Sequence, residues 1–231
     1  MLQRGGNMNI VVDCDGVLIN NVRFEDKVLD FLFRRIMEKY GVSKERAKEM
    51  FWKIGKKLEG RKEWHDWRIY SEELKLGDAW KEAHLANLKY LKLVKGAKDF
   101  LSKVKGDGHR LILASDAIKP VVEWKLNRFG LEKYFDLILS QDDTGCIKSE
   151  EKYFKQILNK LKEPAKNFVV IDNRLDRGIK TAKKLGMKTI YIKRREHSHL
   201  YLRDKEDVEP DFSVKTLGQA YEKIKEIEAR G

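Results

Sequence analysis

Short apolar runs recur along the chain, and they constrain its fold more than any other feature. Each run has four or five residues, many of them β-branched, and reads as a buried parallel strand. From residue 94 to the end, helical patterns alternate with these runs, which predicts a parallel sheet with helices on both faces, an α/β fold. The runs are NIVV (9–12), RLILA (110–114), DLIL (136–139), NFVVI (167–171) and KTIYI (188–192).

Residues 22–92 break this alternation. Broad apolar stripes at helical spacing run through them, Gly41 ends the first stripe, and Ser43 and Asp78 are suitable caps for later helices. No strand candidate interrupts these residues, so we expect an all-helical bundle inserted after the first strand. The expected domains are therefore a core of residues 1–21 and 93–231 and a helical insertion of residues 22–92.

Composition limits the kinds of partner. The net charge is +12, but the lysines and arginines are interleaved with acidic residues, as in SEEKYFKQILNKLKEP (149–164). This pattern is typical of a solvated surface rich in Lys and Glu, as in heat-adapted proteins, and argues against nucleic acid as the partner. A basic module that binds nucleic acid or protein stays open as an alternative function.

Cysteine usage and hydropathy indicate the compartment. Cys14 and Cys146 are far apart and lack C-x-x-C spacing, which favours a reducing environment. The N-terminus has no signal-peptide pattern, and no apolar stretch approaches the roughly 20 residues of a membrane span. We therefore expect a soluble, cytoplasmic protein without a membrane partner. His197 and His199 are not expected to bind a metal, because no acid or third histidine accompanies them.

Polar residues follow several of the predicted strands, at the edge where parallel α/β sheets bind ligands. They are Asp13 and Asp15, Ser115, Lys148, and Asp172 with Asp176. Carboxylates suit Mg²⁺, one carboxylate near the cation can attack phosphorus, and a second can exchange a proton. Lysine and serine suit phosphoryl oxygens. Each residue also has an ordinary explanation, such as a turn or a helix cap, and only their joint placement favours a phosphoryl-transfer site.

The motifs DCDGVL, LILAS, Lys148 and VVIDNRLD occur in an order that resembles the haloacid dehalogenase-like (HAD) hydrolase superfamily. The resemblance implies a three-layer, Rossmann-like core with a helical cap. It implies Asp13 as the nucleophile and Asp15 as the general acid and base. Ser115, with its neighbour Asp116, and Lys148 would then bind the phosphoryl group. Mg²⁺ would lie among Asp13, Asp15, Asp172 and Asp176.

Three features depart from the family pattern. Asp116 follows the serine of the second motif, where a neutral residue is more usual, and a carboxylate there must point away from the phosphate. Ser149 replaces a common proline after Lys148, and we expect it to cap the next helix. DNRLDRGIK is one residue longer than many fourth motifs, and Gly178 occupies a position where a second acid often lies.

The sequence therefore predicts a Mg²⁺-dependent phosphatase that hydrolyses a small soluble phosphomonoester through an aspartyl-phosphate. A phosphomutase of the same superfamily is the close alternative. Asp15 argues for phosphoryl chemistry, because the dehalogenases lack an acid two residues after the nucleophile. Substrate choice would come from the insertion, where RKEWHDWRIY (61–70) offers His65 and Arg68. Trp64, Trp67 and Tyr70 in the same stretch are expected mainly to fill the helical bundle.

Overall fold

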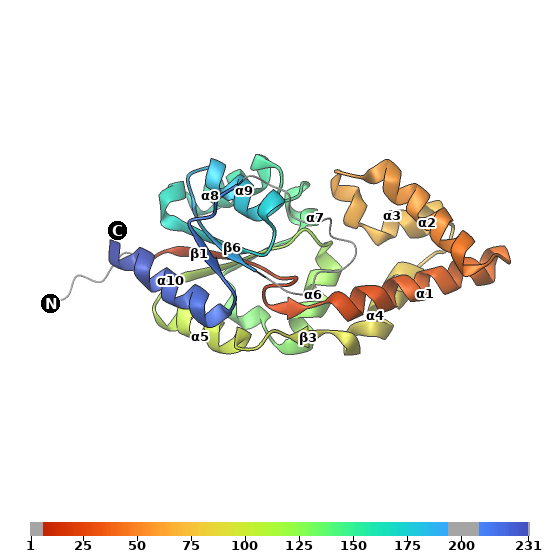
Figure 1. Cartoon of the computed structure of the whole chain (residues 1–231), viewed down its shortest axis with the longest axis horizontal. Coiled ribbons are helices and arrows are strands. Elements are labelled where there is room, and N and C mark those ends of the chain that lie inside the picture. The colour runs from red at the N-terminus through yellow and green to blue at the C-terminus, as the bar shows by residue number, and fades with distance from the viewer. Residues whose placement is uncertain (1–6, 194–207, 231) are drawn as a thin grey trace.

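The computed structural model describes residues 7–193 and 208–230, and these residues contain a six-stranded, wholly parallel sheet in the order β5-β4-β1-β6-β7-β8 (Figure 1). The five predicted strands are confirmed, each to within one residue at either end. The short strand β8 was not predicted. The strands are β1 (Asn9–Asp13), β4 (Arg110–Ala114), β5 (Leu137–Leu139), β6 (Phe168–Asp172), β7 (Lys188–Ile192) and β8 (Phe212–Val214).

Alternation of side chains along the strands explains the two covered faces. Ile10 and Val12 of β1 belong to one buried cluster, whereas Val11 belongs to the other. The first cluster includes residues of α5 (Ala97–Gly106), α6 (Lys119–Phe129) and α10 (Leu217–Arg230). The second includes residues of α8 (Glu151–Leu161) and α9 (Lys180–Lys184). The predicted three-layer α/β architecture is therefore confirmed.

The segment between β2 (Ile19–Asn20) and β3 (Lys92–Leu93) is helical, and it extends away from the sheet in Figure 1. β2 and β3 pair antiparallel, so the chain leaves and re-enters the core at adjacent residues. Ser43 caps α2 by accepting a hydrogen bond from the Arg46 backbone N–H. The helices are α1 (Val22–Tyr40), α2 (Lys44–Leu58), α3 (Trp67–Glu73) and α4 (Ala79–Asn87), with 3₁₀ turns at Lys62–His65 and Leu88–Tyr90.

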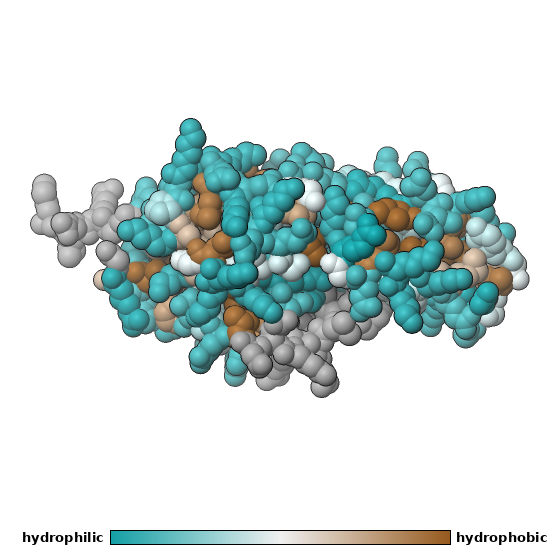
Figure 2. Space-filling model, turned by 90° about the horizontal axis from the view of Figure 1, so that it is seen from above, coloured by the Kyte–Doolittle hydropathy of each residue, from teal (hydrophilic) through white to brown (hydrophobic). Residues whose placement is uncertain are grey.

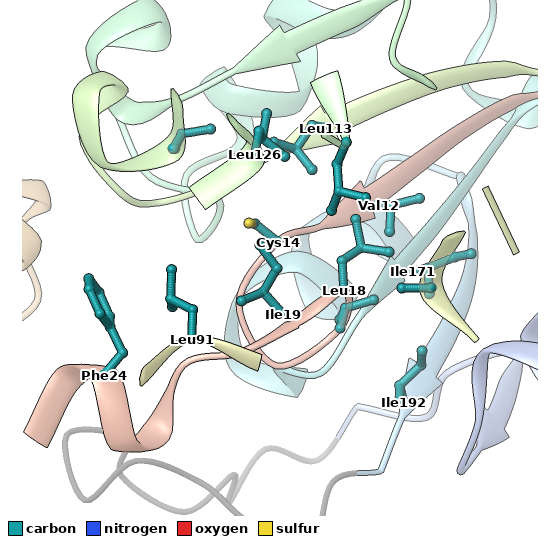
Figure 3. Close-up of a cluster of buried hydrophobic side chains, with 14 of the residues drawn as sticks. Val12, Cys14, Leu18, Ile19, Phe24, Leu91, Leu113, Leu126, Ile171 and Ile192 are labelled. Atoms are coloured by element: carbon teal, nitrogen blue, oxygen red, sulfur yellow. The ribbon is translucent and has the colours of Figure 1, made fainter. Parts of the chain in front are cut away.

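One buried cluster continues from the sheet into this helical segment. In Figure 3 the labelled side chains run from Val12 and Ile171 on the sheet, past Cys14, to Phe24 at the start of α1. Cys14 is fully buried within this cluster. Phe51 and Tyr70, from α2 and α3, belong to the same cluster. Apolar packing therefore joins the two parts in addition to the β2–β3 ribbon.

Other local features complete the structure. The predicted cap at Ser149 is wrong, because α8 begins at Glu151 and Glu150 is its N-cap residue. The remaining elements are α7 (Gln141–Thr144), 3₁₀ turns at Glu132–Tyr134 and Ala165–Asn167, and a π-helical turn at Leu175–Ile179. His197 and His199 lie outside the described residues.

The surface is mainly polar. The face in Figure 2 is mostly hydrophilic, with hydrophobic residues in small separate groups. This distribution agrees with the interleaved charges of the sequence. Within the two described ranges, none of the helices combines the length and the apolar character that crossing a bilayer requires.

Candidate active site

The ends of β1 and β6 bring two carboxylates to one lysine. Asp13 ends β1, Asp172 ends the neighbouring strand β6, and both are almost fully buried. Lys148, from the loop between α7 and α8, donates a hydrogen bond of 2.7 Å to Asp13 Oδ1 and another of 2.7 Å to Asp172 Oδ2. Three residues that are far apart in sequence therefore form one buried ionic cluster.

Burial controls the electrostatics of this cluster. Burial, together with the nearby Asp172 and Asp15 carboxylates, raises the pKa of Asp13 to about 8, although the charge of Lys148 lowers it. Burial alone would lower the pKa of Lys148, but the charges of Asp13 and Asp172 outweigh burial and raise it well above its ordinary value. A further positive charge beside Asp13 would therefore stabilise its ionised form.

Asp15 has a lysine of its own. Lys125 Nζ lies 2.7 Å from each carboxylate oxygen of Asp15. Lys125 comes from the middle of α6 and is 3% exposed. Burial alone would lower its pKa, but the Asp15 charge outweighs burial and the pKa is raised. The two aspartates of DCDG are thus held by two different lysines, which limits their mutual repulsion.

Glycine is required between Asp15 and the next turn. Gly16 has a φ of +77°, a left-handed conformation that side chains other than glycine rarely adopt. A Cβ at this position would also lie 2.1 Å from Asn173 Nδ2. The glycine of the Asp-Gly pair therefore allows the backbone to approach Asn173 at the end of β6. The pair is not the turn of a hairpin, since β1 pairs only with parallel strands in the described sheet.

The end of β4 carries the second motif. Ser115 is buried, and its Oγ accepts a hydrogen bond of 3.2 Å from the Ala117 backbone N–H. Asp116 accepts one hydrogen bond from the Lys148 backbone N–H (2.8 Å) and one from Arg177 Nη1 (3.0 Å). Burial would raise the pKa of Asp116, but the charges of Lys148 and Arg177 lower it. The unusual carboxylate is therefore neutralised by neighbours.

Arg177 also connects the sheet edge with the helical segment. Its Nη1 lies 2.6 Å from Nε2 of His65, which comes from the 3₁₀ turn before α3. Burial and the charge of Arg177 lower the pKa of His65 to about 3, so the imidazole is neutral at pH 7. His65 is thus placed as a neutral hydrogen-bonding group beside the site.

The extra residue of the fourth motif forms the π-helical turn at Leu175–Ile179, a common way to accommodate one inserted residue. Within this turn, Arg174 donates two hydrogen bonds to Asp176, of 2.7 Å and 2.5 Å. Asp172 fills the space beside Gly178, because a Cβ there would lie 2.0 Å from Asp172 Oδ2. The absence of a side chain at position 178 therefore leaves room for the carboxylate of Asp172 at this end of β6.

A cavity of about 70 Å³ opens above these strand ends. Asp13, Asp15, Ser115, Asp116 and Lys148 line it from the core, with Lys125, Asn173, Arg174 and Arg177. Phe24, Glu25, His65, Trp67 and His84 line it from the helical segment. The cavity therefore has a core wall rich in charges. Its helical wall consists of aromatic rings and neutral imidazoles, with Glu25 as its one carboxylic acid. This arrangement suits a small ligand whose anionic end faces the core wall.

Three of the predicted site residues do not line this cavity: Asp172, which binds Lys148, and Arg68 and Asp176. Arg68 donates hydrogen bonds to Asp66 (2.8 and 2.7 Å) and to Asp142 Oδ1 (2.7 Å), so two carboxylates already surround its guanidinium. Asp176 is paired with Arg174 in the same way. The side chains of Arg68 and Asp176 are thus each occupied by an ion pair, and we do not place either residue in the proposed site.

Lys125, Asn173 and Arg177 line the cavity but were not predicted from the sequence. Lys125 had a usable signal, because it lies at helical spacing between the buried Val122 and Leu126 and interrupts an apolar stripe. Asn173 and Arg177 had none, since loop and π-turn residues acquire their direction only from the folded backbone. The position of His84 at the cavity was not predicted either.

The residues at the edge fit a magnesium ion. No group of three or more His, Cys, Asp or Glu side chains within residues 7–193 and 208–230 could hold a metal by itself. Mg²⁺, however, is usually bound through one or two carboxylates, with water and substrate phosphate as the other ligands. Asp13 and Asp172 supply these carboxylates. Asn173 adds a buried Oδ1 without a hydrogen-bond partner, which is a suitable neutral oxygen ligand.

Comparison with known proteins agrees with this geometry. The model of the haloacid dehalogenase-like hydrolase family matches residues 8–186. The chain belongs to this family. A structure described as an HAD phosphatase from Thermococcus onnurineus superposes with a TM-score of 0.83 over 94% of this chain and 97% of that one, at 22% identity. This likeness confirms the HAD fold.

Two curated phosphatases are similar to this chain over part of their length. A glyceraldehyde 3-phosphate phosphatase of Pyrococcus furiosus is 29% identical over 140 residues, 60% of this chain and 57% of the relative. A ribulose-1,5-bisphosphate 5-phosphatase of Halopiger xanaduensis is 28% identical over 151 residues, 64% and 62% respectively. The matched regions thus cover less than two thirds of these relatives.

Proposed function

We propose that the chain is a cytoplasmic, Mg²⁺-dependent phosphatase that hydrolyses a small phosphorylated sugar through an aspartyl-phosphate on Asp13. The observation that carries this proposal is the cluster of Asp13, Lys148 and Asp172 at the sheet edge, with Asp15 beside it at one cavity. The names of the Pyrococcus and Halopiger relatives support a sugar phosphate as the substrate class.

The residues divide the reaction between them. A carboxylate oxygen of Asp13 attacks phosphorus, the bond from phosphorus to the leaving oxygen breaks, and Asp15 gives that oxygen a proton. Asp15 then takes a proton from water, whose oxygen attacks phosphorus and releases inorganic phosphate and free Asp13. Lys148 and Ser115 hold the equatorial oxygens, where charge accumulates in the transition state.

Magnesium, when bound, would neutralise charge on the phosphoryl group and the carboxylates. Asp13 and Asp172 would hold it through their side chains, with Asn173 Oδ1 as a neutral ligand. Asp15, predicted in the metal site, pairs with Lys125 through both side-chain oxygens, so we leave this side chain out of the metal site and keep only its proposed role in proton transfer. Asp176 is left out because Arg174 occupies both of its oxygens.

We also propose that residues 22–92 act as a cap domain that selects the substrate. His65, Trp67 and His84 of this segment line the cavity, so any group attached to the phosphate must contact them. A cavity of about 70 Å³ favours a short carbon chain over a large leaving group. The wall of neutral imidazoles and aromatic rings suits hydroxyl groups and C–H faces of a sugar.

The deciding experiment is a panel of phosphorylated sugars of three to six carbons, incubated with the protein and Mg²⁺. We expect release of inorganic phosphate from one or a few members, and loss of this release with excess chelator or with Asp13→Asn. A rearranged phosphate ester without inorganic phosphate would instead indicate a phosphomutase. No difference between wild type and Asp13→Asn on every member would contradict both.

A further inference from the structure

Lys125 is the one lysine of α6 that lies on the buried face of the helix. Its buried neighbours there are Val121, Val122 and Leu126, so an apolar residue at 125 would continue the stripe. Its Nζ is 2.7 Å from both oxygens of Asp15, and its side chain is 4% exposed. A buried ammonium is strongly unfavourable unless a carboxylate compensates it, and Asp15 is the carboxylate in contact.

The surroundings of this pair show which end of the substrate it faces. The ring of Phe24 lies 5.6 Å from Lys125 Nζ, and the charge of Lys125 contributes to the lowered pKa of His84. Phe24 and His84 both belong to the helical segment and line the cavity. Lys148, on the core side, holds Asp13 and Asp172. The Asp15–Lys125 pair therefore faces the wall next to which the leaving group must lie.

We propose that Lys125 is a positioning residue for Asp15, which holds this carboxylate on the leaving-group side of the cavity. The inference rests on the proposed function, since it assigns Lys125 a part in protonating the leaving oxygen. Without Lys125, Asp15 would be repelled by Asp13 and attracted to Lys148, the lysine that the nucleophile uses. Lys125 would thus hold Asp15 away from Lys148, so that Asp13 acts as the nucleophile and Asp15 transfers the proton.

The leaving group offers a readout that a purely structural role would not change. An alkyl phosphate needs a proton on its leaving oxygen, whereas p-nitrophenyl phosphate has a leaving group that departs without one. We expect Lys125→Met to slow leaving-group release in the first turnover of the best alkyl phosphate by about 10- to 100-fold, part of the usual contribution of acid catalysis. For p-nitrophenyl phosphate we expect less than about a 3-fold loss in the same first-turnover measurement, because transfer of its phosphoryl group to Asp13 does not depend on a placed acid. The later attack of water, which uses Asp15 as a base, is common to both substrates and is excluded by measuring the first turnover alone.

A double-mutant cycle tests whether the effect passes through Asp15. In the Asp15→Asn background, Lys125→Met should change the residual turnover of either substrate by less than about 2-fold. The double variant buries no unpaired charge, so it remains informative if Lys125→Met alone fails to fold. Lys125→Arg, which keeps the charge, should restore part of the alkyl phosphate activity. Arg128→Met, on the exposed side of the same helix, is the matched control.

The outcomes separate this inference from the proposed function. Equal losses on both substrates, or a loss from Lys125→Met that persists in the Asp15→Asn background, would overturn the positioning role while the phosphatase stands. Absence of Mg²⁺-dependent hydrolysis by the wild type would overturn the function itself. Preferential loss on alkyl phosphates, absent from the double variant, is the expected result.

Discussion

The two walls of the cavity are built in different ways. On the core side, Asp13, Lys148 and Asp172 come from strand ends or from the loop beside them, and short ion pairs hold them. On the other side, Phe24 and Trp67 come from separate helices and are held by packing against other rings and apolar side chains. The core wall is therefore specified by sheet topology, whereas the helical wall depends on tertiary packing.

Because of this difference, we expect substitutions on one wall to change the catalytic rate and substitutions on the other wall to change the choice of substrate. A substitution on the core wall alters charges that the reaction uses directly. A substitution on the helical wall alters shape and stability, and reaches the reacting atoms only through the substrate. The four predictions below test that division, from the largest expected effect to the smallest.

The largest effects should come from the two aspartates of DCDG. We expect Asp13→Asn to lower turnover by more than about 10⁴-fold, because the amide cannot attack phosphorus. Asp15→Asn should lower it by about 10²- to 10⁴-fold through lost proton transfer. Steady-state kinetics measure both losses, and rapid quenching should trap an aspartyl-phosphate only in proteins that retain Asp13. Near wild-type turnover of either variant would refute the mechanism.

The metal ligands should come next. Asp172→Ala should weaken Mg²⁺ activation most strongly, and Asn173→Ala should raise the half-saturating Mg²⁺ concentration by about 10-fold or more. Asp176→Ala should change it little, because Arg174 already occupies this carboxylate. Activity titrations and calorimetric Mg²⁺ binding measure these effects with two independent readouts. If Asp176→Ala weakens binding as much as Asp172→Ala, the ligand assignment is wrong.

A smaller effect should come from His84 on the helical wall. Burial lowers its pKa to about 4, although the Trp80 carbonyl and the charge of Lys125 also contribute, in opposite directions. The folded state thus binds fewer protons than the unfolded state, in which the pKa is about 6.5, and stability is lost as pH falls between these values. We expect about 1 kcal/mol of lost stability between pH 7 and 5.5.

Urea unfolding at several pH values checks this prediction. In His84→Gln, the free energy of unfolding should change less with pH than in wild type, whatever the effect of the substitution on stability at pH 7. The opposite sign, with the variant more sensitive to acid, would show that His84 is charged in the folded protein.

The smallest effect should come from Arg68. Its pair with Asp142 is partly exposed, with side-chain accessibilities of 37% and 30%, so we expect a coupling energy of only about 0.2–1 kcal/mol in a double-mutant cycle. Arg68→Ala should leave KM nearly unchanged for every substrate, whereas His65→Ala should raise KM for a sugar phosphate more than for a small aryl phosphate. If Arg68→Ala raised KM for the sugar phosphate as much as His65→Ala does, Arg68 would contact the substrate.

The extent to which the sequence predicted the molecule follows the same division. Continuous apolar runs located five of the six strands of the sheet, because a strand buried on both faces has few other solutions. The strand ends then brought Asp13, Lys148 and Asp172 together. By contrast, the two-residue strands β2 and β3 left no pattern, and Ser213 interrupts the apolar residues of β8.

The positions of the remaining residues were not predicted from the sequence, because they depend on the direction in which each side chain points in the folded protein. Arg68 had the right chemistry for a substrate contact, but Asp142, 74 residues away, is its partner. Asp176 had the right spacing, but the π-helical turn brings it to Arg174. Lys125 would have been found by treating a lysine on an apolar helix face as a signal. Contacts between distant segments decided the positions of Arg68 and Lys125, and the local backbone of the π-helical turn decided that of Asp176.

The β2–β3 ribbon has a consequence for how such a protein can diversify. Ile19 pairs with Leu93 and Asn20 with Lys92, so the helical segment begins and ends on neighbouring strands, about 5 Å apart. Any replacement segment with similarly close ends could be joined there without moving β1 or β4. Recombination at this pair of residues would therefore exchange one selectivity for another while the reacting groups at the sheet edge stay in register.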